Sequence, residues 1–411
     1  MPSRPSTAAA LLRVALAALG LCAAGAFAQG LVPADIPLAL PDAQKIEFQG
    51  KRAGLETRRA QLGTAVSQHN ARCRGLPEDS PLLAECRTAQ LELNASVAGY
   101  RAALDDYNRE LAQAAQTAQT RHAARAAQPF DLQGHRGARG LAPENTLPAF
   151  AAALSLGVTT LELDTGVTRD GVVVVYHDRR LNPDTTRGID GGWLEGQGPP
   201  LRLLDYAELS QFDVGRLRQG SAYAAAQPAQ QPVDGTRIPK LAEVFALARK
   251  ARNEQVRFNI ETKLSPEAPD ESPPPVEFAR AVVAEIRKAG VASRATVQSF
   301  DWRTLAVVQA EAPEIATVYL TGQKFDNAPA KIKQAGGRIW SPNFLGLDLE
   351  TLKQAHTLGL QVVVWTVNEP AQIAAMLDLG VDGIISDRPD LVRAEMAKRG
   401  MPLPQPTPVL P

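Results

Sequence analysis

Three carboxylates stand at the ends of two short apolar runs near the middle of the chain. Glu162 and Asp164 close one run, and Glu261 lies near the end of the next. Carboxylates crowded into one place repel one another, and a divalent cation between them removes that repulsion. Oxygen ligands favour hard cations, so we expect this set to bind Ca²⁺ or Mg²⁺ if the two runs are neighbours. The alternative is that the acids only form ion pairs with Arg136 and Lys263.

Two of the five histidines, His135 and His177, lie beside other short apolar runs. Asp170-Gly171 is a hairpin turn signal, so the segment before His177 should fold back along the strand that carries Asp164. A two-residue turn would place His177 directly opposite Asp164, and a bulge would shift the pairing by one residue. A lone histidine is usually a hydrogen-bonded core residue, but two histidines beside paired carboxylates suit proton transfer.

The elements that must position these residues begin near residue 130, where short β-branched runs alternate with helical stretches. This alternation predicts a TIM-type (β/α)8 barrel, whose strands present side chains for one site at their C-terminal ends. A doubly wound sheet is the alternative. The predicted strands are 132–135, 160–164, 257–263, 295–299, 316–320, 338–341, 361–366 and 383–386. Predicted helices include 241–252, 276–289, 349–358 and 370–379.

Residues 42–126 differ in composition from the rest of the chain, with many good helix formers and almost no strand signal. Apolar residues recur at helical spacing on one stripe in each half of this segment. Gly75 is expected to end the first helix, and Ser80 and Pro81 to begin the second. We therefore predict an N-terminal α-helical hairpin without chemistry of its own. It would be a spacer, a self-association arm or an arm that docks to the cell envelope.

The first 28 residues are typical of a secretory leader. An uncharged apolar run ends in Ala26-Phe27-Ala28, a small-x-small cleavage signal, and is too short for a comfortable membrane span. We expect cleavage after Ala28, a periplasmic or secreted location, and no membrane span in the mature chain. An uncleaved anchor is the alternative.

Cleavage would leave two cysteines, Cys73 and Cys86, on either side of the predicted hairpin tip. Disulfides persist in exported proteins, so we expect a bridge between them. Two free thiols buried between the helices are the alternative.

Composition limits the partners and the domain plan. Lys and Arg total 44 and so do Asp and Glu, which gives a formal net charge of zero. We expect no nucleic-acid partner, because such partners require a basic excess. The predicted parts are a leader at 1–28, the hairpin at 29–126, the barrel at 127–396 and an extended, mobile, Pro-rich tail at 397–411.

Several short motifs follow one another along the predicted barrel. They are His135-Arg136-Gly137, Pro143-Glu144-Asn145-Thr146, Glu162-Leu163-Asp164, Asp170-Gly171, His177-Asp178, Asn259-Ile260-Glu261-Thr262-Lys263, Gln298-Ser299-Phe300, Trp365-Thr366-Val367-Asn368 and Ser386-Asp387-Arg388-Pro389. In this order they resemble the glycerophosphodiester phosphodiesterase family, one of the phospholipase C-like phosphodiesterase barrels, over residues 130–395. The hairpin lies outside the resemblance. The sequence also departs from the family's pattern after His177-Asp178 and through residues 188–236.

The resemblance implies an enzyme that hydrolyses small glycerophosphodiesters to glycerol 3-phosphate and an alcohol. It assigns Glu162, Asp164 and Glu261 as metal ligands. It assigns His135 and His177 as general acid and general base, and the sequence leaves open which is which. Related alternatives are a lysophospholipase D or a phosphatidylinositol phospholipase C activity. A barrel that has lost activity and binds the envelope is an alternative of another class, which the complete motifs argue against.

Other polar residues of these motifs would assist. Arg136 and Lys263 suit the binding of phosphate oxygens. Glu144 is expected either to orient Arg136 or to bind the metal, and Asn145 to support that loop. Gln298 and Trp365 are expected to contact the substrate, with packing at the top of the barrel as the alternative for both.

Overall fold

The computed structural model describes residues 31–37, 40, 42–127, 130–322 and 325–411. The chain forms two compact units, which divide between Ala124 and Arg125. The predicted leader at 1–28 lies outside the described residues. Among the residues that are described, no helix combines the length and the apolar character that a membrane span requires.

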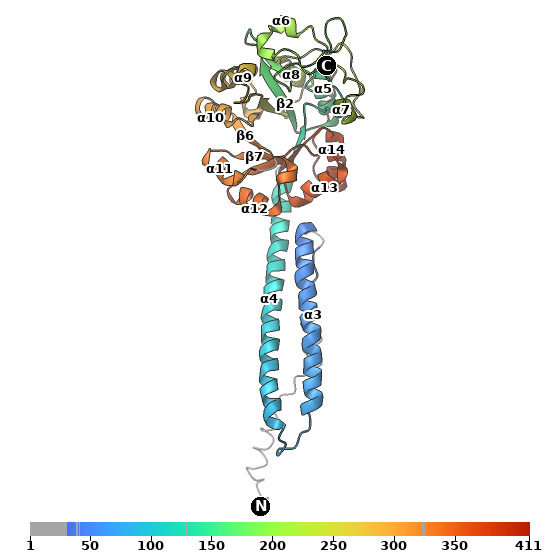
Figure 1. Ribbon diagram of the computed structural model, residues 1–411, viewed down its shortest axis with the longest axis vertical. Helices are drawn as coiled ribbons and strands as arrows, with labels where there is room; N and C mark the ends of the chain where they lie inside the picture. Colours follow the sequence, from blue (N-terminus) through green and yellow to red (C-terminus); the bar gives the residue numbers. More distant parts are fainter. Residues whose placement is uncertain (1–30, 38–39, 41, 128–129, 323–324) are drawn as a thin grey trace, which may run out of the picture. The chain divides into compact units, whose positions relative to one another are not determined.

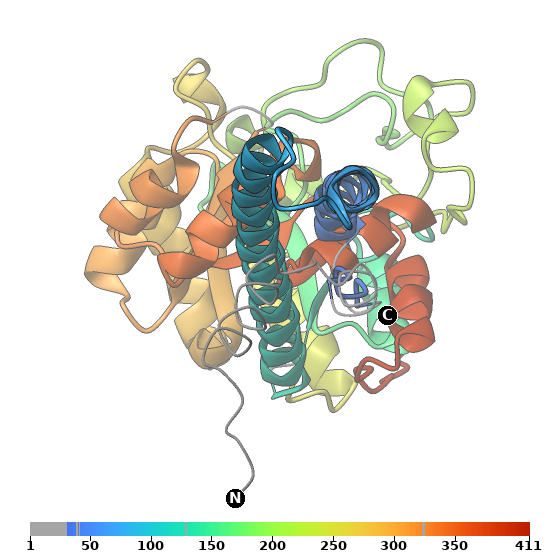
Figure 2. The same cartoon turned by 90° about the horizontal axis from the view of Figure 1, so that it is seen from below.

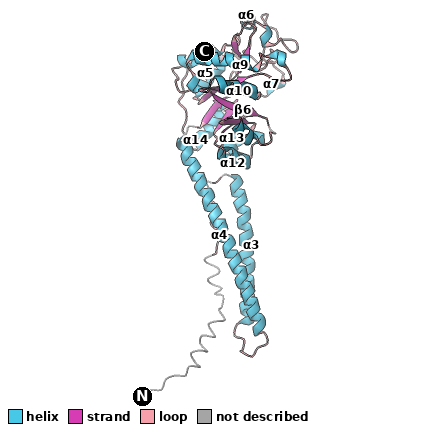
Figure 3. Ribbon diagram, turned by 90° about the vertical axis from the view of Figure 1, so that its left-hand side faces the viewer, coloured by secondary structure: helices cyan, strands magenta, loops and turns pink. Residues whose placement is uncertain are grey.

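The first unit is a hairpin of two long helices, α3 (Asp42–Cys73) and α4 (Leu83–Ala127), which run side by side (Figures 1 and 3). One apolar seam holds them together, because the stripe residues of both helices face each other and are buried. The seam consists of Leu40, Phe48, Leu55, Leu62, Tyr100, Leu104, Tyr107 and Leu111. Residues preceding α3 pack along it, and Tyr100 donates a hydrogen bond to the Leu31 carbonyl (2.9 Å).

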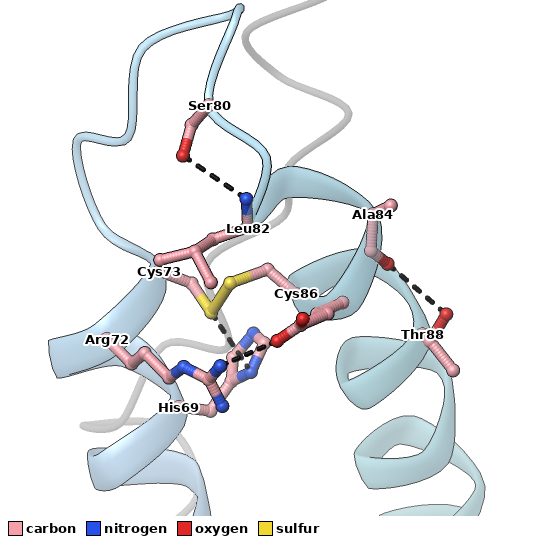
Figure 4. Close-up of a disulfide and its surroundings, with 9 residues drawn as sticks. His69, Arg72, Cys73, Ser80, Leu82, Ala84, Cys86 and Thr88 are labelled. Atoms are coloured by element: carbon pink, nitrogen blue, oxygen red, sulfur yellow. Dashed lines mark hydrogen bonds and ion pairs between the residues drawn. A yellow bond between two sulfur atoms is a disulfide. The ribbon is translucent and has the colours of Figure 1, made fainter.

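The tip of the hairpin is a tight turn closed by a disulfide between Cys73 and Cys86, whose Cα atoms are 5.9 Å apart (Figure 4). Gly75 adopts a positive φ of 76° just after the first helix, a conformation that suits glycine. Helix α4 begins at Leu83, two residues later than the predicted start at Pro81. The reason is that Ser80 and its neighbours form a separate turn, in which the Leu83 N–H binds the Ser80 carbonyl.

The second unit is a closed barrel of eight parallel strands, which confirms the predicted (β/α)8 fold. Each strand pairs with the next, and β1 closes the ring by pairing with both β2 and β9. Its strands are β1 (Asp131–Gly134), β2 (Thr160–Val167), β4 (Arg257–Thr262), β5 (Ala295–Ser299), β6 (Ala316–Thr321), β7 (Ile339–Pro342), β8 (Gln361–Val364) and β9 (Gly383–Ser386).

Helices surround the strands, as Figure 2 shows for the orange and red segments. The main ones are α5 (Leu147–Leu156), α8 (Leu241–Lys250), α9 (Pro275–Ala289), α10 (Trp302–Glu311), α11 (Ala328–Gln334), α12 (Leu349–Thr357), α13 (Pro370–Leu379) and α14 (Pro389–Lys398). Their apolar faces and the strands form one continuous core. Burial of this core between the two layers supplies most of the driving force for folding of the barrel.

A ninth strand, β3 (Val173–Val175), pairs antiparallel with the end of β2. The predicted hairpin therefore forms, but its register differs by one residue, because Thr165 pairs with Val175 and Asp164 then faces Tyr176. The cause is a turn of three residues rather than two, with Gly171 at a positive φ of 79°.

Between β3 and α8 lies a long insertion with only short helices, η1 (Leu201–Leu203), α6 (Tyr206–Leu209) and α7 (Ala222–Ala225). It has a small apolar core of its own, which includes Leu181, Leu201 and Leu209. This insertion contains residues 188–236, where the sequence leaves the family pattern.

The C-terminal tail has no helix or strand, but it is held against the barrel rather than free as predicted. The Thr407 N–H binds the Leu154 carbonyl (2.8 Å), and Arg393 donates to the Pro404 carbonyl (2.7 Å). Met401, Leu403 and Val409 pack on the core, which the Pro-rich composition of the tail does not reveal.

Candidate active site

The three predicted metal ligands meet at one end of the barrel. Asp164 on β2 pairs in register with Glu261 on β4, which brings their side chains to the same level. Glu162 lies two residues before Asp164 and so points to the same side of its strand. Ligand atoms of the three carboxylates all lie within 4.8 Å of one another, and the three residues are buried.

Crowding and burial shift the protonation of this set. Burial, and then the charge of Asp164, raise the pKa of Glu162 well above its ordinary value. Burial likewise raises the pKa of Glu261 to about 7. Burial also acts to raise the pKa of Asp164, but the charge of Lys263 and its neighbours outweighs that effect and holds it well below the usual range. Three ionised carboxylates this close together repel one another, and a divalent cation would offset that repulsion.

Two positively charged side chains lie next to the carboxylates, so the site can contain ion pairs and still bind a metal ion. Lys263 places its Nζ 2.8 Å from Glu261 Oε1 and 3.1 Å from Asp164 Oδ1. Arg136 places its Nε 3.3 Å from Asp164 Oδ2. Asp164 Oδ1 is buried, and its ion pair with Lys263 lacks the geometry of a hydrogen bond, so this oxygen can also serve as a ligand atom.

His135 follows the last residue of β1 and has a carboxylate partner that the sequence analysis did not assign. Its Nδ1 lies 2.5 Å from Asp387 Oδ1, and its Nε2 lies 4.0 Å from Glu162 Oε2. Burial, and then the charge of Arg139, lower the pKa of His135 to about 4, although Asp387 acts in the opposite direction. The ring is therefore neutral near pH 7. An ionised Asp387 can only accept a hydrogen bond, so the proton lies on Nδ1 and Nε2 is free to exchange one.

His177 has a similar arrangement. Its Nδ1 lies 2.6 Å from Asp178 Oδ1, and Asn182 binds the other oxygen of Asp178 at 2.7 Å. Burial, followed by the charges of Arg136 and Lys263, lowers the pKa of His177. The hairpin register differs by one residue from the prediction, but His177 still lies beside the carboxylates. The reason is that His177 follows the end of β3 at Val175.

Arg136 is held by a network that the loop after β1 creates. This residue adopts a positive φ of 52°, which turns its N–H towards Glu162 Oε2 at 2.8 Å. Its Nη1 donates to Glu144 Oε1 (2.9 Å), so of the two predicted roles Glu144 takes that of orienting Arg136. Asn145 donates to Asp164 Oδ2 (2.8 Å) and thereby supports the ligand set.

Gln298 and Trp365 occupy different positions at the rim. Gln298 donates to Glu162 Oε1 (2.7 Å) and accepts from Asn259 (2.9 Å), so both ends of its amide are engaged. Gln298 therefore orients a carboxylate. Trp365 packs edge-on against Phe300, with ring centroids 5.4 Å apart, and donates to the Ser341 carbonyl.

The insertion supplies two further residues that sequence reasoning missed. The Tyr223 hydroxyl accepts from Arg136 (2.8 Å) and Arg139 (3.2 Å) and donates to Glu144. Gln227 donates to Asp387 Oδ2 (3.1 Å). No motif marks either residue. Asp387 did carry a signal, because it lies inside the Ser386-Asp387-Arg388-Pro389 motif, whereas Arg139 lies between two motifs.

A cleft of about 640 Å³ opens beside the carboxylates. His177, Glu261 and Lys263 line one part of it, and Arg179, Arg180, Asn182, Glu271 and Phe300 line the rest. This volume is typical of small-molecule binding sites. The site thus combines a cation-binding acid set, two neutral imidazoles and fixed positive charges, which suits attack on an anionic ester.

Comparison with known proteins agrees with this chemistry. The model of the Glycerophosphoryl diester phosphodiesterase family matches residues 135–391. A glycerophosphodiester phosphodiesterase of Bacillus subtilis (strain 168) is 31% identical over 267 residues, which cover 62% of this chain and 83% of that protein. One from Bacillus altitudinis is 30% identical over 268 residues, covering 64% and 97% of the two chains.

Solved structures show the same barrel. A protein from Silicibacter pomeroyi DSS-3, assigned as a glycerophosphoryl diester phosphodiesterase, superposes with a TM-score of 0.63 and 35% identity. The match covers 66% of this chain and 95% of that one. A phosphodiesterase of Oleispira antarctica in complex with the product sn-glycerol-3-phosphate gives a TM-score of 0.51 at 23% identity, covering 64% and 96%. That second likeness shows the fold alone.

Proposed function

Because this chain belongs to the glycerophosphoryl diester phosphodiesterase family, we propose that it hydrolyses glycerophosphodiesters to glycerol 3-phosphate and an alcohol with the aid of a divalent cation. One observation carries the proposal. Three buried carboxylates lie within 4.8 Å of one another at the barrel mouth, beside Lys263 and a histidine that has its own carboxylate partner. No observation favours the lysophospholipase D, phospholipase C or inactive envelope-binding alternatives.

Glu162, Asp164 and Glu261 are the residues that would hold the cation. Their fit rests on the oxygen-only donor set, on the raised pKa values of two of the acids, and on the buried Oδ1 of Asp164, which has an ion pair but no hydrogen bond. When bound, Ca²⁺ or Mg²⁺ would supply positive charge that stabilises the developing charge on the phosphate oxygens.

The chain's own cations would bind the same phosphate group. Arg136 and Lys263 are each fixed by carboxylates, Arg136 by Glu144 and Lys263 by Glu261. Fixed donors lose little entropy when they meet an anion, so they would orient the ester without reorganisation of the site.

The two histidines would move the protons. Both have lowered pKa values, so each is neutral and able to accept a proton at Nε2 near pH 7. One ring would accept the proton of the attacking water at Nε2 and become an imidazolium. The other would act as the acid, and it must first bind a proton at Nε2 before it can deliver that proton to the leaving alkoxide. The proton gained by the first ring would restore this charged form through solvent. Asp387 and Asp178 would stabilise the imidazolium that forms transiently on each ring.

One assay can test both the identity of the products and the dependence of the reaction on a metal ion. The purified chain would be freed of metal with a chelator and assayed with sn-glycero-3-phosphoethanolamine before and after Ca²⁺ or Mg²⁺ is restored, with phosphorus NMR to identify the product. We expect glycerol 3-phosphate, and a loss of activity of at least ~10² without metal, since several kcal/mol of charge stabilisation depend on it. Full activity after verified metal removal, or release of the phosphate on the other alcohol, contradicts the proposal.

We also propose that the leader directs export, so that the enzyme acts in the periplasm or outside the cell. The Cys73–Cys86 bridge supports this, because disulfides are rare in reducing compartments. The helical hairpin would then be a spacer, a self-association arm or an envelope-docking arm, and the exposed polar surface of its helices fits each of these roles.

A further inference from the structure

The cleft beside the active site is larger than the glycerol and phosphate groups require. Its volume of about 640 Å³ lies in the range of sites for much bulkier ligands. His177, Glu261 and Lys263 line it at the reacting centre, and the same cleft continues over Arg179, Arg180 and Glu271. It can therefore hold a large alcohol group while the phosphodiester lies at the carboxylates.

Two arginines in this cleft share a single acid. Arg179 donates its Nε to Glu271 Oε2 at 2.9 Å, and Arg180 donates its Nε to Glu271 Oε1. These hydrogen bonds hold the pKa of Glu271 below its ordinary value, and the bond from Arg180 has the largest effect. Glu271 is therefore ionised. One negative charge neutralises only one of the two guanidinium groups. The other carboxylate at this end of the cleft, Asp178, is bound by His177 and Asn182 instead, so one guanidinium group has no acid partner of its own.

The arginines also retain donors for a ligand. Within the described residues, the only acceptor of Arg179 is Glu271, and that bond uses Nε. Each arginine side chain is 33% exposed, so its terminal nitrogens can be reached from solvent. A guanidinium fork is well matched to phosphate oxygens, with which it forms paired hydrogen bonds.

The loop that contains the two arginines is continuous with the segment that contains His177. Arg179 and Arg180 follow directly after His177 and its partner Asp178. The loop is fixed by hydrogen bonds from Leu201 N–H to the Arg179 carbonyl (2.9 Å) and from Asn182 to Asp178 (2.7 Å). A group bound by the arginines would therefore be at a set position relative to the histidine.

This inference rests on the proposed hydrolysis. We propose that the cleft is the binding subsite for the alcohol half of the substrate, and that Arg179 and Arg180 select alcohols that carry a second phosphate group. A cationic alcohol such as choline would be repelled by the guanidinium group that has no acid partner of its own. It would also lack the aromatic cage that binds quaternary ammonium groups, because Phe300 is the only aromatic residue in the described lining.

Three substrates that differ only in the alcohol test the subsite. The full mature chain would be assayed for kcat/KM with glycerophosphocholine, glycerophosphoglycerol, and the bis-phosphodiester bis(glycerophospho)glycerol. We expect the bis-phosphodiester to be preferred over the choline ester by at least about tenfold, the worth of one partly exposed hydrogen bond between charged groups. In Arg179→Ala and Arg180→Ala that selectivity ratio should fall by about tenfold, mainly through KM.

Charge-preserving and charge-raising variants separate recognition from folding. Arg179→Lys should keep more selectivity than Arg179→Ala, because the charge remains. Glu271→Gln should raise the preference for the bis-phosphodiester about threefold, since it removes the shared negative charge but keeps an acceptor. Arg280→Ala is the control, because that arginine pairs with Glu311 on α9 and α10 outside the cleft lining, and it should leave the ratio unchanged.

The outcomes distinguish this inference from the proposed function. Failure of the wild-type chain to hydrolyse all three esters overturns the proposed function and the subsite with it. Hydrolysis of all three with a ratio that none of the Arg179, Arg180 and Glu271 variants changes overturns the subsite alone. The arginines would then serve only to clamp the loop that contains Glu271. If the alanine variants do not fold, Arg179→Lys and Glu271→Gln decide the question by the same ratio.

Discussion

At the residue scale, the site pairs each imidazole with a carboxylate that stabilises its protonated form. His135 has Asp387 and His177 has Asp178, both through Nδ1. Burial lowers both histidine pKa values, and the aspartates partly offset that effect. The result is a pair of neutral bases that can nevertheless become charged for the duration of a proton transfer.

Removal of either ring should therefore abolish most of the activity. We expect His135→Ala and His177→Ala each to lower turnover by at least ~10², the usual contribution of general acid–base catalysis. A natural diester such as glycerophosphoglycerol is needed, because an activated aryl ester does not require the acid. His69→Ala in the hairpin is the matched control and should retain wild-type turnover. Near-normal turnover in either barrel variant, with unchanged circular dichroism, would disprove that residue's role.

The partner of His135 makes a second prediction at this scale. Asp387 accepts from His135, from Arg139 (2.6 Å) and from Asn368 (2.8 Å), and its negative charge acts to raise the pKa of His135. In Asp387→Asn that effect is lost, so the pKa of His135 falls further and His135 becomes a weaker base. We expect turnover to decrease by about tenfold or more and the acid limb of the kcat/KM profile to move to lower pH.

The control for this variant is Asp378→Asn, because among the described residues Asp378 forms an ion pair with Arg399 alone, on the barrel surface. It should change neither turnover nor the profile. An acid limb that stays in place in Asp387→Asn would show that His135 does not control it.

At the scale of elements, the β3–α8 insertion completes the site that the barrel strands begin. The strands place the carboxylates, but Arg136 is fixed in part by Tyr223 and Asp387 in part by Gln227, both from the insertion. The insertion also binds the loop after β1 through the Gln230 side chain and the Arg139 carbonyl (2.7 Å). This part of the chain thus positions residues of the proposed active site, and it has a small apolar core of its own.

Tyr223→Phe tests whether the insertion supports the site, because it removes only the hydroxyl that binds Arg136, Arg139 and Glu144. Without the hydroxyl, Arg136, Arg139 and Glu144 each lose a partner, and each buried charged group left without one costs about 1–3 kcal/mol. We expect kcat/KM to decrease by about tenfold, chiefly through KM, because Arg136 would hold the phosphate less firmly. Tyr206→Phe is the matched control, since its hydroxyl donates to the Ile238 carbonyl elsewhere in the insertion and contacts none of the proposed site residues in the described part of the chain. Equal kinetics for the two variants would remove Tyr223 from the site.

At the scale of the whole molecule, the chain consists of two compact units with different reasons for stability. The barrel has an extensive buried core, whereas the hairpin has a single apolar seam and a disulfide at its tip. All the residues of the active site come from the second unit. The bridge should therefore matter to the hairpin and leave the chemistry unaffected.

A double variant tests this separation. A loop of about 15 residues closed by a disulfide contributes roughly 3 kcal/mol in the chain-entropy model. In Cys73→Ser/Cys86→Ser we expect faster hydrogen exchange throughout α3 and α4 and unchanged kcat/KM. Slower hydrolysis by a fully folded barrel would show that the two units are coupled.

The sequence by itself determined most of the barrel and the identity of its main site residues. The strands at 295–299 and 383–386 and the helix at 370–379 have the predicted bounds, because their apolar runs end at clear turn residues. The three carboxylates, the two histidines and Arg136 lie together because each lies near the C-terminal end of a strand, and parallel strands in a barrel end on the same side.

Only the tertiary structure decided which loops meet at that end. Asp387 reaches His135 across 252 positions of sequence, and Tyr223 comes from a stretch without periodicity or motif. The β3 register depended on whether a turn of three residues was more favourable than one of two, which a count of residues leaves open. Periodic patterns report the environment of one element at a time. Contacts between irregular loops depend instead on how the barrel brings distant loops together, so they become visible only when the chain is folded.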